Sequence, residues 1–125
     1  MFDYEIVMSS LTKISKAIET IIERTSAVDN LEDLLHSQNG MMVIDAICMN
    51  LIALGETVKG LDKQTNGQLL KNYPDVYWRV VMGMRDKISH HYFEIDTDVV
   101  FRTLEEDIPK MKPVVEKMIV DLRKE

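Results

Sequence analysis

A short stretch of the sequence gathers side chains that could transfer protons and bind an anion: Arg85-Asp86-Lys87-Ile88-Ser89-His90-His91-Tyr92. It lies in 71–93, a block in which four basic residues outnumber two acidic ones. Histidine titrates near neutral pH and can act as a general acid or base. Arginine presents a permanently charged planar fork that fits two phosphate oxygens. His90 and Arg85 are therefore candidates for proton transfer and for phosphate binding.

The spacing within this stretch sets which side chains can meet. On a helix Asp86 and His90 are i,i+4 neighbours, so the carboxylate can fix the imidazole tautomer and favour its protonated form. Arg85 and Ser89 are paired in the same way. Arg85 and His90 diverge by about 140° on an ideal helix. They converge only if the helix ends or distorts between them, or if both face a cleft shared with another subunit.

Amphipathic helices are expected to position this stretch. Apolar residues recur along the chain at steps of three and four, and this spacing predicts such helices. A first helix of about 25 residues ends near 26–30. A short turn or helical piece covers 31–37, and Asn39-Gly40 is a loop signal before a long core helix that ends at 60–67. Three small residues on this long helix would allow close helix approach: Ala46, Ala53 and Gly55.

The second half of the chain predicts three further helices. Pro74 fits the first turn of the third helix, which we expect to end at 91–93. Thr97 and Asp98 can start a fourth helix, and Pro109 can open a fifth. Acids at 94, 96 and 98 lack the glycine and the closing glutamate of a calcium loop, so they are read as acids at a helix start.

Composition favours one all-α domain over 1–125. Only five glycines and three prolines leave little punctuation for strands and turns. Short connections favour a compact up-and-down bundle of four to five helices. The nine methionines are read as core filler. Tyr77 and Trp78 could stack nucleic-acid bases or could belong to the core or to a dimer interface.

Charge and cysteine content exclude several classes of protein. A net charge of −6 argues against a protein that grips nucleic acid over its whole surface. The single cysteine, Cys48, excludes an intrachain disulfide and predicts a buried, inert thiol in a reducing compartment. His36 has no ligand partner at metal spacing, so no metal site is expected. The acidic N-terminus and the short apolar runs argue against export and against a membrane span.

Several segments together resemble one family: Met84-Arg85-Asp86, His90-His91-Tyr92-Phe93 and Ile95-Asp96, with Asp45-Ala46-Ile47 and Leu54-Gly55-Glu56 upstream. This combination resembles the HepT-like toxins of the HEPN superfamily of small helical ribonucleases. The resemblance implies a homodimer in the prokaryotic cytoplasm, with two Arg/His pairs in one cleft. It implies metal-independent RNA cleavage without a cofactor. It also implies a partner, a minimal nucleotidyltransferase antitoxin that adds AMP to the motif tyrosine, here Tyr92.

The chemistry of RNA cleavage suits these residues. The neighbouring 2′-hydroxyl is the nucleophile when no metal takes part, so an enzyme must move protons and stabilise a phosphorane. We expect His90 to be the general acid or base, Arg85 to hold the phosphate and Asp86 to orient His90. Relatives often have asparagine where this chain has Asp86, and a carboxylate there repels a phosphate. It therefore pairs with His90 or Arg85, or it lowers activity.

Three further residues are candidates for supporting the cleft. Glu56 could hold Arg85 or could be a solvated helix residue, and His91 could take over proton transfer or face solvent. Ser89 is the third candidate. The alternative function is a catalytically silent helical dimer that serves as a binding or substrate module for the same nucleotidyltransferase. The net charge and Asp86 favour this alternative.

Overall fold

The computed structural model describes residues 2–91 and 94–124, with residues 89–91 and 94 described by their backbone alone. The elements in chain order are α1 (Tyr4–Ser26), η1 (Leu31–His36), α2 (Gln38–Gln64), η2 (Leu70–Asn72), α3 (Trp78–Met82), α4 (Met84–Ile88), β1 (Ser89–His91), β2 (Glu94–Ile95), α5 (Thr97–Arg102), η3 (Thr103–Asp107) and α6 (Ile108–Arg123). The predicted all-α fold is confirmed. In the described part of the chain, the β structure is one short antiparallel hairpin.

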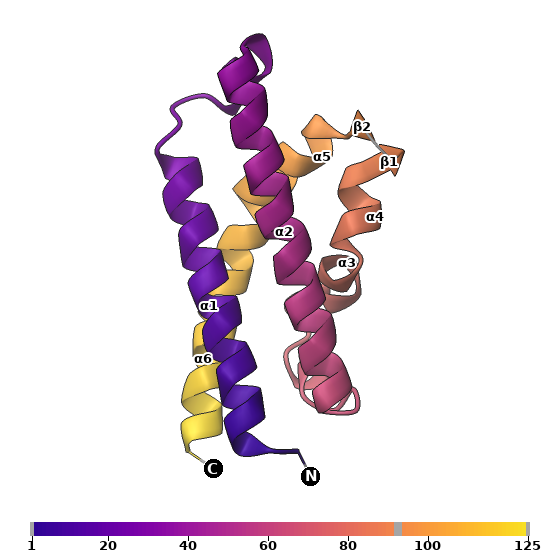
Figure 1. Ribbon diagram of the computed structural model, residues 1–125. Coiled ribbons are helices and arrows are strands. Elements are labelled where there is room, and N and C mark those ends of the chain that lie inside the picture. Colours follow the sequence, from indigo (N-terminus) through magenta and orange to yellow (C-terminus); the bar gives the residue numbers. More distant parts are fainter. Residues whose placement is uncertain (1, 92–93, 125) are drawn as a thin grey trace.

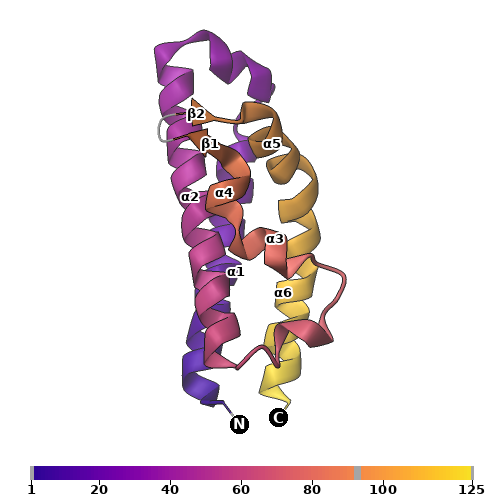
Figure 2. The ribbon, with the colours of Figure 1, turned by 90° about the vertical axis from the view of Figure 1, so that its right-hand side faces the viewer.

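The bundle is built from three long rods, namely α1, α2 and the continuous run of α5, η3 and α6 (Figure 1). α1 packs against both α2 and α6, while α3 and α4 lie against α2. Seen after a quarter turn, α3 and α4 lie between α2 and the rod made by α5, η3 and α6 (Figure 2). The described helices number six because the predicted third helix is split at Gly83 into α3 and α4.

The apolar stripes predicted from the sequence are buried and form the hydrophobic core. The buried side chains that carry them are Val7, Leu11, Ile14, Ile18 and Ile21 on α1, Ile44, Ile47, Leu51, Leu54, Val58 and Leu61 on α2, and Met111, Val115, Met118 and Leu122 on α6. One stripe from each long rod thus meets in a single hydrophobic cluster. Burial of such stripes is the main source of helix stability in a small bundle.

Side-chain caps set the helix starts. Asp3 accepts hydrogen bonds from the amides of the first turn of α1, and Asp96 accepts one from Val99 N at 3.1 Å to start α5. Asp96 is therefore a cap, in line with the reading of acids at a helix start. Ser37 caps α2 by accepting from Gly40 N at 2.9 Å.

Two predicted helix starts are wrong. Asn39-Gly40 lies inside α2, not in a loop, because Gly40 is needed for close approach: a Cβ there would collide with the backbone of Leu34. The third helix begins at Trp78 instead of Pro74. Residues 74–76 form a turn, after which the Trp78 indole N–H donates to the Tyr73 carbonyl at 2.8 Å and the buried ring is fixed in the core.

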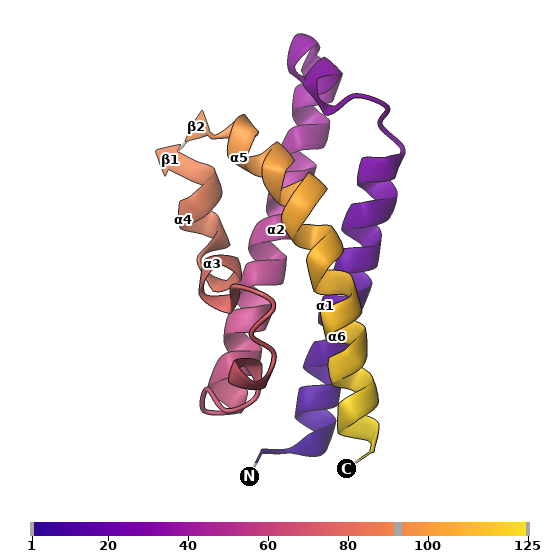
Figure 3. The same cartoon turned by 180° about the vertical axis from the view of Figure 1, so that it is seen from behind.

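The start at Pro109 is close to the prediction. α6 begins at Ile108, and Pro109 lies in its first turn. The rod does not stop there, because η3 is a π-helical segment in which the Ile108 amide donates to the Thr103 carbonyl. The predicted fourth and fifth helices are thus one rod with a local widening, which Figure 3 shows from behind.

One helix, α2, is long and apolar enough to cross a membrane by length and composition, with a mean hydropathy of 1.6 over its best window. Asp45 and Asn50 interrupt the apolar run of this helix without lowering its mean hydropathy below that level, so the short uninterrupted runs in the sequence did not indicate it. Core helices of soluble proteins pass the same test. Only 39% of that window is buried, so α2 also presents an exposed apolar face.

Candidate active site

Gly55 fixes the distance between α2 and the helices that carry the motif. It is buried, and a Cβ at this position would lie 2.5 Å from the Val81 carbonyl oxygen and 3.0 Å from Met84 Cβ. α3 and α4 therefore rest on α2 at a point where only glycine fits without a shift. Of the three small residues expected to allow close helix approach, Gly55 does so within the chain.

α4 is held by both of its ends and by one ion pair. Met84 and Ile88 are each only 1% exposed. Lys87 Nζ lies 2.8 Å from Asp107 Oδ2 and so ties α4 to η3. Arg85 and Asp86, between these anchors, are exposed.

The Arg85 side chain is exposed and has no partner among the described residues. It forms no hydrogen bond or ion pair with any residue that the structure describes, and this includes Glu56, which is itself exposed on α2. An exposed, unpaired guanidinium on a rigid helix can bind a phosphate without first breaking an internal contact.

The helix that carries the motif ends earlier than predicted. α4 stops at Ile88, not at 91–93, and His90 lies in β1. The Ile88 carbonyl accepts a hydrogen bond from the Asp96 amide at 2.8 Å, which closes the hairpin. The sequence has no glycine or proline here to stop the helix, so the stop depends on pairing with residues that follow.

This early end changes the geometry expected for Asp86. Because the helix does not continue through His90, the two residues are not i,i+4 helical neighbours, and that prediction is corrected. Asp86 is exposed and forms no hydrogen bond or ion pair with a described residue. The backbone does meet the condition set for convergence of Arg85 and His90, namely a helix that ends between them.

Part of the motif lies beyond what the structure describes. Tyr92, the expected site of AMP addition, lies outside the described residues, as does Phe93. Ser89, His90 and His91 are placed by their backbone in β1.

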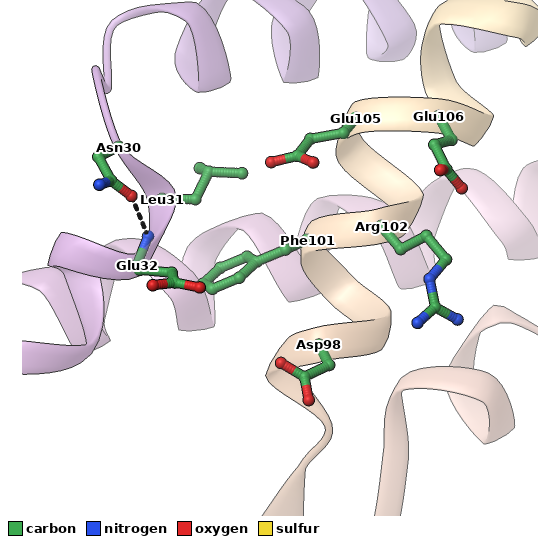
Figure 4. Close-up of a pocket in the computed structure, with 8 residues that line it drawn as sticks. All are labelled: Asn30, Leu31, Glu32, Asp98, Phe101, Arg102, Glu105 and Glu106. Atoms are coloured by element: carbon green, nitrogen blue, oxygen red, sulfur yellow. Dashed lines mark hydrogen bonds between the residues drawn. The ribbon is translucent and has the colours of Figure 1, made fainter.

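A hollow of about 520 Å³ lies between η1 and the α5–η3 segment (Figure 4). Four carboxylates line it, from Glu32, Asp98, Glu105 and Glu106, with Arg102 at one side. Such a surface repels a polyanion. This hollow is therefore a poor place for a phosphate.

An exposed apolar stripe on α2 was not predicted from the sequence. Met42, Ala46, Met49 and Ala53 follow one another at steps of four, three and four on the face opposite the buried stripe, and all are exposed. Met42 is 63% and Met49 71% exposed, so the reading of all methionines as core filler is wrong for these two. The signal was a second apolar repeat out of phase with the first.

The remaining candidates take structural roles. Burial, and secondarily the charge of Asp45, raises the pKa of the Cys48 thiol to about 11, so it is an inert core thiol as predicted. Trp78 is buried, whereas Tyr77 is 83% exposed. Among the residues whose side chains the structure describes, no three His, Cys, Asp or Glu side chains are grouped so that they could hold a metal ion.

Comparison with known proteins shows which family the chain resembles. The family model described as "Ribonuclease HepT-like" matches residues 14–118. A protein of Thermococcus cleftensis named "Probable ribonuclease HepT" is 33% identical over 86% of this chain and 91% of its own length. A protein of Methanocaldococcus jannaschii named "Putative RNase MJ0125" is 31% identical over 93% of each chain. No solved structure matches the chain significantly.

Proposed function

This chain belongs to the ribonuclease HepT-like family, and we propose that it is a metal-independent endoribonuclease toxin of a toxin–antitoxin pair. Ribonuclease activity follows from membership of the family. The observation that supports the finer proposal is Arg85: an exposed guanidinium without a partner among the described residues, on a helix anchored by Met84 and Ile88, five residues before His90.

The proposed reaction uses the RNA's own 2′-hydroxyl. A general base takes the proton from this hydroxyl, the oxygen attacks the adjacent phosphorus, and the bond from phosphorus to the 5′-oxygen breaks. A general acid gives a proton to the leaving 5′-oxygen, and a 2′,3′-cyclic phosphate remains. His90 serves as acid or base, and Arg85 stabilises the additional negative charge of the phosphorane. A second copy would supply a second His90, so that acid and base could be separate side chains.

The exposed stripe of α2 supports the homodimer. Met42 and Met49 are large apolar side chains that a monomer leaves in water. Ala46 between them and Ala53 one step beyond Met49 allow two helices to approach closely. We expect Met49→Lys to convert the dimer into a monomer in sedimentation velocity. Val120→Lys is the matched control, because it changes an exposed apolar side chain on α6 and should leave the mass unchanged. Met8→Lys would not serve, because Met8 packs against the core.

The regulatory part of the proposal rests on the family resemblance. A nucleotidyltransferase antitoxin would add AMP to Tyr92 in the prokaryotic cytoplasm. A bulky anionic nucleotide two residues from His90 would block and repel RNA. Coexpression with such a partner should increase the intact mass by one or more adenylyl groups, and Tyr92→Phe should abolish the increase. An unchanged mass of the wild-type chain would remove this part of the proposal.

A second candidate function is the silent dimer that presents a substrate to the nucleotidyltransferase. Asp86 favours it, since this exposed carboxylate has no described partner that would neutralise it beside a bound phosphate. The supporting residues Glu56, Ser89 and His91 would have no catalytic role in that case.

Cleavage of total cellular RNA by the purified, unmodified protein in excess EDTA separates the two functions. The enzyme predicts cleavage by the wild type and a loss of about 10²- to 10⁴-fold in His90→Ala, the usual contribution of a general acid or base. Arg85→Ala should lose a similar factor. Arg79→Ala, which removes another exposed arginine of the same basic block, should keep full activity. Absence of cleavage by the wild type would favour the silent dimer.

A further inference from the structure

A second pocket, of about 260 Å³, lies between α3–α4 and the α5–η3–α6 rod. Its floor is apolar and is made by the buried side chains of Val76, Val81, Met84 and Met111. At its mouth Tyr77 is 83% exposed and Val80 44% exposed. We refer to it as the Tyr77 pocket. Figure 3 shows the two groups of helices that enclose it.

The charges around the Tyr77 pocket favour an anion. Lys87, Arg102 and Lys110 line it, against the carboxylates of Asp75 and Asp107. Asp107 is already bound to Lys87 at 2.8 Å. Arg102 and Lys110 form no ion pair with a described residue, so within the lining of this pocket two cations face the one unpaired carboxylate, that of Asp75; Arg102 also borders the acidic hollow beside η1. In a chain of net charge −6 this is a local reversal of sign.

Tyr77 has the exposure of a stacking platform. A folded domain gains from burying a tyrosine ring, yet this ring projects into solvent, and its hydroxyl makes no hydrogen bond with a described residue. An aromatic face binds a nucleobase of any identity, because every base has a π-face. Bases that are unstacked in single-stranded RNA are bound in this way.

Resting on the proposed ribonuclease function, we propose that the Tyr77 pocket holds one unstacked nucleotide of the RNA substrate, with its base stacked on Tyr77 and its phosphate at Arg102 and Lys110. The volume of about 260 Å³ limits the occupant to one nucleotide and excludes a longer segment. Met84 and Lys87 flank Arg85 on α4, so this subsite adjoins the helix that carries the proposed phosphate-binding residue.

Two methionines in the pocket floor provide a local reporter. We would label methionine methyl groups with ¹³C and titrate the protein with UMP, CMP, AMP and GMP separately. The Met84 and Met111 methyl resonances should shift with saturation, while those of Met42 and Met49 on α2 stay fixed. Absence of a shift at Met84 and Met111 with every nucleotide at millimolar concentration would overturn the proposal.

Variants separate stacking from charge. Tyr77→Ala should weaken nucleotide binding about tenfold, within the range found when a stacking aromatic is replaced by alanine, and Tyr77→Phe should retain binding. Tyr4→Ala removes another exposed tyrosine, on α1, and should have no effect. Arg102→Gln should weaken UMP by about fivefold or more and leave uridine unchanged. Equal binding by wild type and Tyr77→Ala would contradict the subsite.

Failure of the Tyr77 pocket can be told apart from failure of the proposed ribonuclease function. His90→Ala should lose RNA cleavage yet bind nucleotides as the wild type does. Cleavage without nucleotide binding would refute the Tyr77 pocket and leave the ribonuclease intact, whereas nucleotide binding without cleavage would do the reverse. A Tyr77→Ala variant that loses dimer mass but not nucleotide binding would assign Tyr77 to a protein interface and refute the proposal.

Discussion

Replacement of Gly55 by alanine tests the contact that positions α4. The new Cβ would lie 2.5 Å from the Val81 carbonyl oxygen, whereas ordinary contact begins at 3.4 Å, so α3 and α4 must move away from α2 by about 0.9 Å. The obstacle is backbone, which cannot rotate aside as a side chain would. Overpacking of this kind costs about 1–3 kcal/mol, partly offset by about 1 kcal/mol because alanine favours the helix.

Gly60→Ala is the matched control, because Gly60 lies on the same helix with nothing within 4 Å of its virtual Cβ. It should stabilise the protein by about 0.5–1 kcal/mol. Gly55→Ala should instead destabilise it by up to about 2 kcal/mol, the overpacking cost less the gain in helix propensity, which lowers Tm by up to about 8 °C for a domain of this size. Thermal unfolding followed by circular dichroism measures both changes. A Tm for Gly55→Ala equal to or above that of Gly60→Ala would refute the close-approach role.

The same substitution should affect cleavage more than stability alone explains. Arg85 moves with α4, and a displacement near 1 Å can cost an enzyme about 10²-fold in rate. Cleavage measured well below the Tm of the variant, where it is fully folded, separates misplacement from unfolding. Full activity of folded Gly55→Ala would show that RNA cleavage tolerates this displacement of α4.

Two further predictions follow from the titrating groups. The Cys48 thiol, with a pKa of about 11, should react with a disulfide reagent at pH 8 about 100-fold more slowly than a thiol of ordinary pKa 9.0, and unfolding in guanidinium should restore the rate. Hydrogen bonds from Lys117 and, secondarily, Tyr73 hold the pKa of Asp121 below its ordinary value of 3.8. The resulting stabilisation is therefore present above pH 3.8 and is lost as the pH falls through the lower folded value. In a ¹³C carboxyl titration, Lys117→Met should raise the Asp121 pKa more than Tyr73→Phe does.

The long rods could be predicted from sequence because their information is local. A stripe such as Ile44 to Leu61 repeats at the helical period, and whatever it packs against, its apolar side must be buried. The exact ends were less predictable. Gly40 was read as a turn residue, yet its role is to admit the backbone of η1, a contact that no local pattern reports.

The motif shows the same division between local and long-range information. The residue types of Arg85 and His90 indicated their chemistry without any structure. The end of α4 at Ile88 depends on the Asp96 amide, eight positions further on, so the helical pairing expected for Asp86 could not be corrected from spacing. Gly83 did give a local signal for the break between α3 and α4 that the apolar repeat concealed.

The distribution of charge leads to a prediction for RNA affinity. The hollow beside η1 is lined by four carboxylates and disfavours phosphates, and the proposed phosphate contacts are Arg85, Arg102 and Lys110. Two neutralised phosphates of a single strand, one at Arg85 and one at Arg102 and Lys110, give a slope of about −1.4 in log K against log salt. A 2′-O-methyl oligonucleotide, which cannot be cleaved, allows this slope to be measured by fluorescence anisotropy. The double variant Arg102→Gln/Lys110→Gln removes one of the two phosphate contacts and should reduce the slope by about 0.7. A wild-type slope steeper than about −5 would require a basic surface that three side chains cannot supply, and would place the RNA elsewhere on the protein.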